Sequence, residues 1–190
     1  MYPVTYASSR LALRELTVDD VDAVHAIYGS PKATEHLSFE PRTRDQVAHL
    51  IAGAMVSATA QPRTEYNLAA CRADDGALIG FGRIARDPHA QQAATMGFAL
   101  HPEAWGVGYG TETARALISL SLNELKLHRV WAARAPKNIA SEKTLLSAGM
   151  TKEGRIRHHV HVRGAWRDSI TYSAVADDWN DTLTSANKEN

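Results

Sequence analysis

Residues 101–117, HPEAWGVGYGTETARAL, place glycines at three alternate positions, Gly106, Gly108 and Gly110, directly before a helical pattern. The residues just before them, ATMGFAL (94–100), are typical of a strand. Such a turn lets successive backbone N–H groups converge without side chains in the way. At a helix N-terminus these donors and the positive end of the helix dipole suit an anion, above all phosphate. A tight strand-to-helix corner that only permits close packing is the alternative reading.

Two common phosphate-binding motifs do not fit this turn. It lacks the Gly-Lys-Ser/Thr ending of an NTPase loop, so it offers no lysine for a γ-phosphate and no hydroxyl for magnesium. It also lacks the dinucleotide pattern of two glycines followed by a third three positions later. The turn therefore predicts another kind of phosphate ligand.

The composition is that of an ordinary soluble domain. The 190 residues are 44% apolar, and Lys plus Arg balance Asp plus Glu at 21 each, so no overall charge attracts nucleic acid or an anionic membrane, and neither is expected as a partner. The N-terminus has no basic and apolar leader pattern, and no run is long enough to span a membrane, so we expect a cytoplasmic protein. Cys71, the single cysteine, lies in a predicted strand and is expected to be a buried, inert thiol.

Hydrophobic periodicity predicts the order β-α-α-β-β-β-α-β-α-β-β. Strands are expected at 10–16, 65–73, 77–86, 92–100, 128–135, 151–162 and 166–175, and helices at 17–30, 43–61, 111–125 and 138–148. Thr17 and Thr43 open the first two helices. This order predicts an α/β (α+β) fold, with a mixed central sheet of about seven strands flanked by about four helices. We expect one domain over 9–176, with flexible termini at 1–8 and 177–190.

The glycine turn with its flanks, GFALHPEAWGVGYGTETARAL, resembles the acyl-coenzyme A signature of the GNAT N-acetyltransferases. It is most similar to the RimJ/RimL-like branch (ribosomal-protein-alanine acetyltransferase-like), which often reads HPEYWGKGYATEA. The segments NIASEKTLLSAGMTKEG and HVHVRGAWRDSITYSAV resemble that branch too, so the resemblance covers about 9–176. It departs from the general family motif at Trp105, where Gln or Arg is usual. The resemblance implies the GNAT fold and acetyl-CoA as acyl donor.

The resemblance also implies which residues contact the cofactor. It implies that the pantetheine arm and the thioester carbonyl bind to backbone groups of a splayed strand, at Phe98, Ala99 and Leu100. It implies that the pyrophosphate binds to the turn, whose residues are Trp105, Gly106, Val107, Gly108, Tyr109, Gly110 and Thr111. Gly97 marks either a bulge or that splay. Asn138 is implied as a further coenzyme A contact, and Ser141 as an acid beside the sulfur. From the residues alone, Asn138 caps a helix and Ser141 satisfies its first turn.

Acetyl transfer to an amine needs a neutral amine, a polarised carbonyl and a protonated leaving thiolate. No tyrosine stands between Tyr109 and Tyr172, so Ser141 is the candidate acid. His158, in RIRHHVHV, and Glu103 are the candidate general bases, and water is the third option. The histidines of RIRHHVHV lack a fourth ligand of recognisable spacing, so no metal is expected.

The acceptor side is expected at residues 34–41 and 158–166. The candidate contacts are Glu35, His36, Glu40 and Trp166, and carboxylates there suit a cationic amine. An amine acceptor and a monomer or homodimer are expected. Two alternatives stay open: a different donor (a longer acyl-CoA, or an aminoacyl-tRNA, which the balanced charge disfavours) and a non-catalytic acyl-CoA-binding module.

Overall fold

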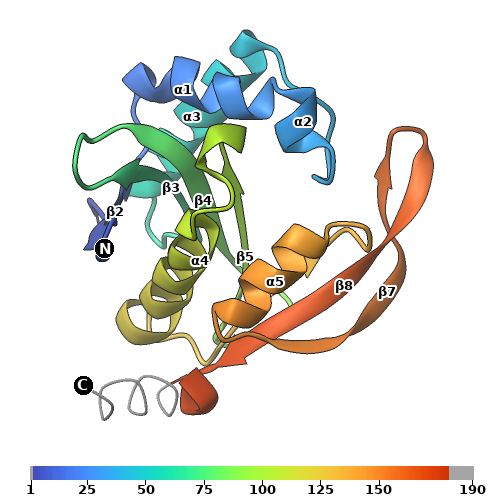
Figure 1. Ribbon diagram of the computed structural model, residues 1–190. Coiled ribbons are helices and arrows are strands. Elements are labelled where there is room, and N and C mark those ends of the chain that lie inside the picture. Colours follow the sequence, from blue (N-terminus) through green and yellow to red (C-terminus); the bar gives the residue numbers. More distant parts are fainter. Residues whose placement is uncertain (1, 180–190) are drawn as a thin grey trace.

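The computed structural model describes residues 2–179 and shows one mixed sheet with helices on both faces (Figure 1). The strand order is β1-β2-β3-β4-β5-β6-β8-β7. The pairing is antiparallel everywhere except between β5 and β6, which are parallel. The strands are β1 Thr5–Ala7, β2 Leu11–Glu15, β3 Glu65–Arg72, β4 Leu78–Arg86, β5 Ala93–Leu100, β6 Arg129–Arg134, β7 Thr151–Val162 and β8 Ala165–Val175.

The helices form two layers. Helices α1 (Val21–Tyr28) and α3 (Arg44–Thr59) cover one face of the sheet, with the short α2 (Pro31–Thr34) beside them. Helices α4 (Tyr109–Ser119) and α5 (Ile139–Ser147) cover the other face. The two faces bury separate apolar clusters, which include Val24 and Ile51 on the first side and Leu117 and Leu145 on the second. The predicted fold class is therefore confirmed.

The helix starts follow the expected capping chemistry. The Thr43 hydroxyl accepts a hydrogen bond from the Gln46 backbone N–H, and the Gln46 side chain accepts one from the Thr43 N–H. Thr17 makes the same reciprocal arrangement with Asp20, at the head of a 3₁₀ turn (Val18–Asp20) that leads into α1. Both predicted helix starts are confirmed, with the first turn tighter than an α-helix.

The sheet has one strand more than the seven predicted. In residues 1–8, which were expected to lie outside the domain, Thr5–Ala7 pair with β2 and Val4 is buried. A strand of three residues has too little alternation to be recognised from sequence. Beyond residue 176, Trp179 is also buried against the core. The rest of the expected C-terminal segment, 180–190, lies outside the described residues.

Two further findings concern the rest of the chain. The thiol of Cys71 is buried, and burial raises its pKa, as expected for an inert cysteine. Within residues 2–179, no helix combines the length and apolarity needed to cross a bilayer.

Candidate active site

Strands β5 and β6 separate part-way along their length. They pair in parallel only at Ala93, Ala94 and Thr95. Beyond Thr95, β5 continues to Leu100 on the edge of β4 alone, and β6 continues to Arg134 on the edge of β8 alone. The inner edges of both strands therefore lose their partner where the chain enters the loops before α4 and α5. Gly97 shows no bulge in its pairing with β4, so the splayed strand, rather than a bulge, is the correct reading.

The unpaired edge of β5 presents specific backbone groups. The backbone N–H of His101 donates to the carbonyl of Ile79 next to β4. Because successive backbone N–H groups of a strand point to opposite sides, Ala99 also points toward β4, whereas Phe98 and Leu100 point toward the open edge. The Leu100 carbonyl accepts a hydrogen bond from the indole of Trp105 at 3.0 Å. The Phe98 backbone and the Leu100 N–H are therefore the groups turned toward a ligand at this edge.

The glycine turn adopts conformations that only glycine takes easily. Gly106 and Gly108 have φ values of 81° and 91°, and Gly108 stands in the N-cap position of α4. Among the residues that the structure describes, no side chain caps this helix, so the N–H groups of its first turn have no side-chain acceptor there. Gly110 is helical, and a Cβ there would lie 3.4 Å from Leu100 and 3.5 Å from Thr144. The turn therefore combines an uncapped helix N-terminus with close packing, and both readings of its glycines hold.

Residues 8–10, in the connection between β1 and β2, fix this turn. The Arg10 guanidinium donates to the Val107 carbonyl at 3.0 Å and to the Glu112 carboxylate at 2.8 Å. The same carboxylate accepts hydrogen bonds from the Ser8 and Ser9 hydroxyls and from the Arg10 N–H. Partial burial opposes the charge on Glu112, but these hydrogen bonds outweigh it and lower the pKa of its carboxyl group. Sequence reasoning missed Arg10 and Glu112, and their separation of 102 residues left no local signal.

Trp105 braces the turn from the other side. Besides the bond from its indole to Leu100, its ring lies 5.7 Å from the Lys32 ammonium of α2. Its side chain stands where the family motif has Gln or Arg, and it is 44% exposed. The structure therefore gives Trp105 a positioning role, tying the glycine turn to the end of β5.

The N-terminus of α5 lies beside that of α4. Asn138 caps α5, since its side-chain oxygen accepts from the Ser141 N–H at 3.0 Å. Within the described part of the chain, the Ser141 hydroxyl makes no hydrogen bond. Thr144, one turn further along α5, faces Gly110 of α4. Two helix N-termini therefore flank the point at which β5 and β6 diverge, and both direct their positive ends to it.

The loop before Asn138 is held by a buried arginine. The Arg134 guanidinium donates to the carbonyls of Ala135 and Pro136, at 2.9 and 2.8 Å, and to the hydroxyl of Tyr172 at 3.1 Å. It also forms an ion pair with Glu142 of α5, whose carboxylate accepts from the Tyr172 hydroxyl. This cluster fixes the start of α5, and no sequence pattern had indicated it.

A family comparison decides what this arrangement is. The model for the acetyltransferase (GNAT) domain matches residues 10–151, well over half of the chain. The chain belongs to the GNAT acetyltransferase family. It is therefore an N-acetyltransferase, and the predicted family and enzyme class are confirmed.

Individual relatives agree with this assignment. The uncharacterized N-acetyltransferase YoaA of Bacillus subtilis is 27% identical over 176 residues, which are 92% of this chain and 98% of YoaA. The ribosomal protein uS5-alanine N-acetyltransferase of Escherichia coli is 27% identical over 109 residues, 56% of this chain and 55% of that enzyme. Among solved structures, Mycobacterium smegmatis RimJ in complex with CoA-disulfide superposes with a TM-score of 0.81 at 20% identity, covering 93% and 90% of the two chains. These neighbours confirm the resemblance to the RimJ/RimL-like branch.

Neither predicted general base of this acetyltransferase is held by its surroundings. The Glu103 side chain is 90% exposed, and its carboxylate lies 3.8 Å from the Nδ1 of the His101 ring. His158 is exposed and lies where the β7–β8 register shifts between Ile156 and Val160, with φ at 48°. Its backbone N–H donates to Asp168, but its imidazole makes no hydrogen bond with another described residue. The regular strand expected at His158 is therefore interrupted.

The two predicted acceptor segments do meet. The β7–β8 hairpin extends past the sheet toward α2 (Figure 1). At its tip Arg163 donates to the Thr34 carbonyl at 2.9 Å, and Arg167 donates to the His36 and Leu37 carbonyls at 2.9 and 3.2 Å. The hairpin therefore holds the backbone of residues 34–37, which follows α2.

The four predicted acceptor contacts lie at different places on this surface. Glu35 is exposed at the end of α2, and His36 is half-buried, with its carbonyl bound to Arg167. Trp166 is 60% exposed and makes an edge contact with the His161 ring. Glu40 lines a pocket of about 840 Å³ between the segment after α2 and helix α3.

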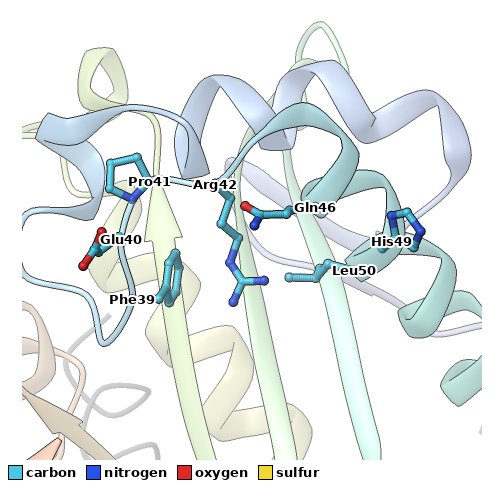
Figure 2. Close-up of a pocket in the computed structure, with 7 residues that line it drawn as sticks. All are labelled: Phe39, Glu40, Pro41, Arg42, Gln46, His49 and Leu50. Carbon is cyan, nitrogen blue, oxygen red and sulfur yellow. The ribbon is translucent and has the colours of Figure 1, made fainter. Parts of the chain in front are cut away.

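Figure 2 shows this pocket, in which the Arg42 side chain extends downward between Phe39 and Leu50. The Arg42 guanidinium lies 4.5 Å from the centre of the Phe39 ring and 5.7 Å from that of Tyr28. The Tyr28 ring meets Phe81 of β4 edge-on at 4.4 Å, and Phe81 is paired with Ala99 of β5. The pocket therefore lies over β4 and β5, on the face that α1 and α3 cover.

Proposed function

We propose that the enzyme transfers the acetyl group of acetyl-CoA to a primary amine by direct attack of the amine on the thioester. The observation that carries the proposal is the divergence of β5 from β6 between two helix N-termini. An extended edge beside an uncapped, glycine-rich helix start matches a ligand with an amide-bearing arm and a pyrophosphate. The relative solved with CoA-disulfide has this fold.

In this pose the pyrophosphate accepts hydrogen bonds from the first-turn N–H groups of α4, Tyr109 to Thr111, while Gly106 and Gly108 let it approach closely. The pantetheine arm runs along the open edge of β5. The backbones of Phe98 and Leu100 bind the arm there, whereas the backbone of Ala99 points toward β4 and pairs with that strand. Asn138 keeps its capping role and lines the other side of the thioester.

The chemistry requires few protein groups. The amine nitrogen attacks the carbonyl carbon, and a backbone N–H on the open edge stabilises the developing oxyanion. The carbon–sulfur bond then breaks. Ser141, whose hydroxyl has no other hydrogen bond in the described chain, donates its proton to the thiolate at the N-terminus of α5 and takes up the proton that the newly acylated nitrogen releases, so the serine ends neutral and CoA leaves as the thiol. Because the His158 and Glu103 side chains are both exposed and no hydrogen bond from a described residue holds either of them, water removes the proton from the incoming ammonium in this proposal.

The acceptor is a primary amine on a protein N-terminus or on a small molecule. The relative that acetylates ribosomal protein uS5 on alanine supports the first of these. The small-molecule option is supported by the pocket of about 840 Å³ lined by Glu40, which is large enough for a compact amine.

A thermal-shift series tests the donor. At one hundred times Kd, acetyl-CoA stabilises the native state by about 2.7 kcal/mol. That corresponds to roughly 5–10 °C in Tm for a domain of this size. CoA release by the wild type in the presence of a panel of amines then tests transfer. No rise in Tm at saturating acetyl-CoA would remove the proposal, whereas binding without any CoA release would leave a non-catalytic acyl-CoA module.

A further inference from the structure

The pocket over β4 and β5 contains an arginine with unused donors. Among residues 2–179 no carboxylate pairs with Arg42 and no side chain or carbonyl accepts from it, and its Nε is buried without a partner. Other arginines in the structure have a carboxylate at hydrogen-bond distance, such as Arg14 with Asp20 and Arg63 with Glu15. Burial of this Nε–H without an acceptor is costly, because the donor has lost water and gained nothing in return.

The aromatic residues around Arg42 satisfy only part of the guanidinium. Phe39 and Tyr28 contact it through cation–π interactions, which leave the N–H donors unsatisfied. Those donors form a fork that matches the oxygens of a carboxylate or phosphate in bidentate geometry. Two other polar atoms of the lining are already engaged, since the Gln46 Oε1 accepts from the Thr43 N–H and the His49 Nδ1 bonds to the Asp45 carbonyl.

The position of the pocket links it to the reaction. Tyr28 touches Phe81, and Phe81 pairs with Ala99, which lies between the two β5 residues that face the open edge. The donor lies on the α4 and α5 side of the sheet in the proposed function, and the pocket lies on the opposite side. Arg163 and Arg167 hold the segment that leads into Phe39 and add positive charge nearby. This contrasts with the cationic acceptor that Glu35 and Glu40 suggested in the sequence.

We propose that Arg42 binds an oxyanion of the acceptor, so that the preferred substrate is a compact amine that also carries a carboxylate or phosphate group. This inference rests on the proposed acetyl transfer and specifies the substrate class of the same enzyme. Arg42 acts as a specificity residue: it places the amine at the thioester by holding the other end of the molecule, with Phe39 as a flat wall beside the anion.

Matched acceptors test the inference. Each amino acid is compared with its α-amide, which keeps the amine and removes the charge, and phosphoethanolamine is compared with ethanolamine. CoA release is measured at fixed acetyl-CoA. A charge-assisted hydrogen-bonded pair predicts that kcat/KM favours the anionic member of a pair roughly 10- to 100-fold. The first comparison responds to a carboxylate site and the second to a phosphate site.

Variants assign the preference to Arg42. Arg42→Gln is expected to abolish the preference, mainly by raising KM for the anionic amine, and Arg42→Lys to keep part of it. Arg44→Gln is the matched control: Arg44 is exposed, lies two residues away and pairs with Asp22. The Tm rise with acetyl-CoA is measured for every variant, which separates loss of folding or of donor binding from loss of acceptor recognition.

The outcomes separate this inference from the proposed function. If the wild type does not bind acetyl-CoA, both the proposed function and the role of Arg42 are refuted. A wild type that binds acetyl-CoA but shows no preference for anionic amines, or turns none of them over, overturns the role of Arg42 and leaves donor binding standing. An unchanged preference in Arg42→Gln does the same.

Discussion

A negative charge introduced at the third residue of α4 separates the anion-binding role of the glycine turn from its structural role. Thr111 is half-buried and its side chain is not engaged with another described residue. A carboxylate at this point of a helix favours folding, since it meets the positive end of the dipole and can cap the first turn. The same carboxylate repels a bound pyrophosphate. Thr111→Glu is therefore expected to keep or raise the stability of the fold and to weaken acetyl-CoA binding.

The size of the effect follows from Coulomb's law. A phosphate bound to the first-turn N–H groups stands about 6 Å from a carboxylate at residue 111, and an effective dielectric constant of about 20–40 suits a partly exposed site. Each pair of unit charges then costs roughly 1.5–3 kcal/mol. Taking one dominant pair, Kd for acetyl-CoA rises roughly 10- to 100-fold. Salt near 1 M reduces the effect, because the screening length falls to about 3 Å.

Calorimetric titration with acetyl-CoA measures this directly, with Thr111→Gln as the neutral control of the same shape. Urea unfolding of both variants without ligand supplies the stability comparison. If Thr111→Glu binds acetyl-CoA as tightly as Thr111→Gln at low salt, the pyrophosphate does not lie at this helix start, and the pose along β5 must be abandoned with it.

Three further predictions follow from other contacts. Asn138→Ala loses a helix cap and about 1 kcal/mol of stability in urea unfolding; Asn138→Asp restores that stability, and if its kcat/KM stays low, the amide also serves the cofactor. Glu112→Gln leaves Arg10 poorly paired and is expected to raise Kd for acetyl-CoA by calorimetry more than it lowers Tm, whereas equal effects on free and bound protein would refute a role in shaping the turn. Burial opposes the charged form of Asp20, but hydrogen bonds from Arg14 and Thr17 outweigh it and lower the pKa of this carboxyl group. The stability that the Asp20 carboxylate contributes is therefore present above the unfolded pKa of about 4 and is lost as the pH falls toward the folded value. Asp20→Asn should lower the free energy of unfolding at pH 7 by about 2 kcal/mol, and its stability should fall less steeply with pH in acid than that of the wild type.

Local patterns predicted most of the secondary structure. Alternation marked β2 to β5, and Thr17 and Thr43 marked helix starts, because each of these signals lies within a few residues. The three-residue β1 carries no such signal. The shift in β7 near His158 was equally invisible, since it depends on how the strand pairs with β8 rather than on its own residues.

Two features of the proposed donor side were predictable for a similar reason. The glycine turn and the Asn138 cap are short, contiguous features, so the sequence located them, while their long-range supports were missed. Arg134 looked like any strand residue, yet it holds the loop before Asn138 through Tyr172, which follows it by 38 residues. Contacts of this kind depend on the assembled sheet, and one sequence does not reveal them.

The acceptor side was harder because its chemistry depends on which charges are already paired. In the sequence, Glu35 and Glu40 suggested a cationic acceptor, while no ligand-binding role was predicted for Arg42, Arg163 or Arg167. In the structure the two hairpin arginines bind backbone carbonyls and Arg42 lies stacked and unpaired in a pocket. The sequence states which residues are charged, but whether a charge is available to a substrate depends on neighbours that are distant in the chain. For this reason the preference for an amine that also carries an anion is the part of the function that only the folded arrangement suggests.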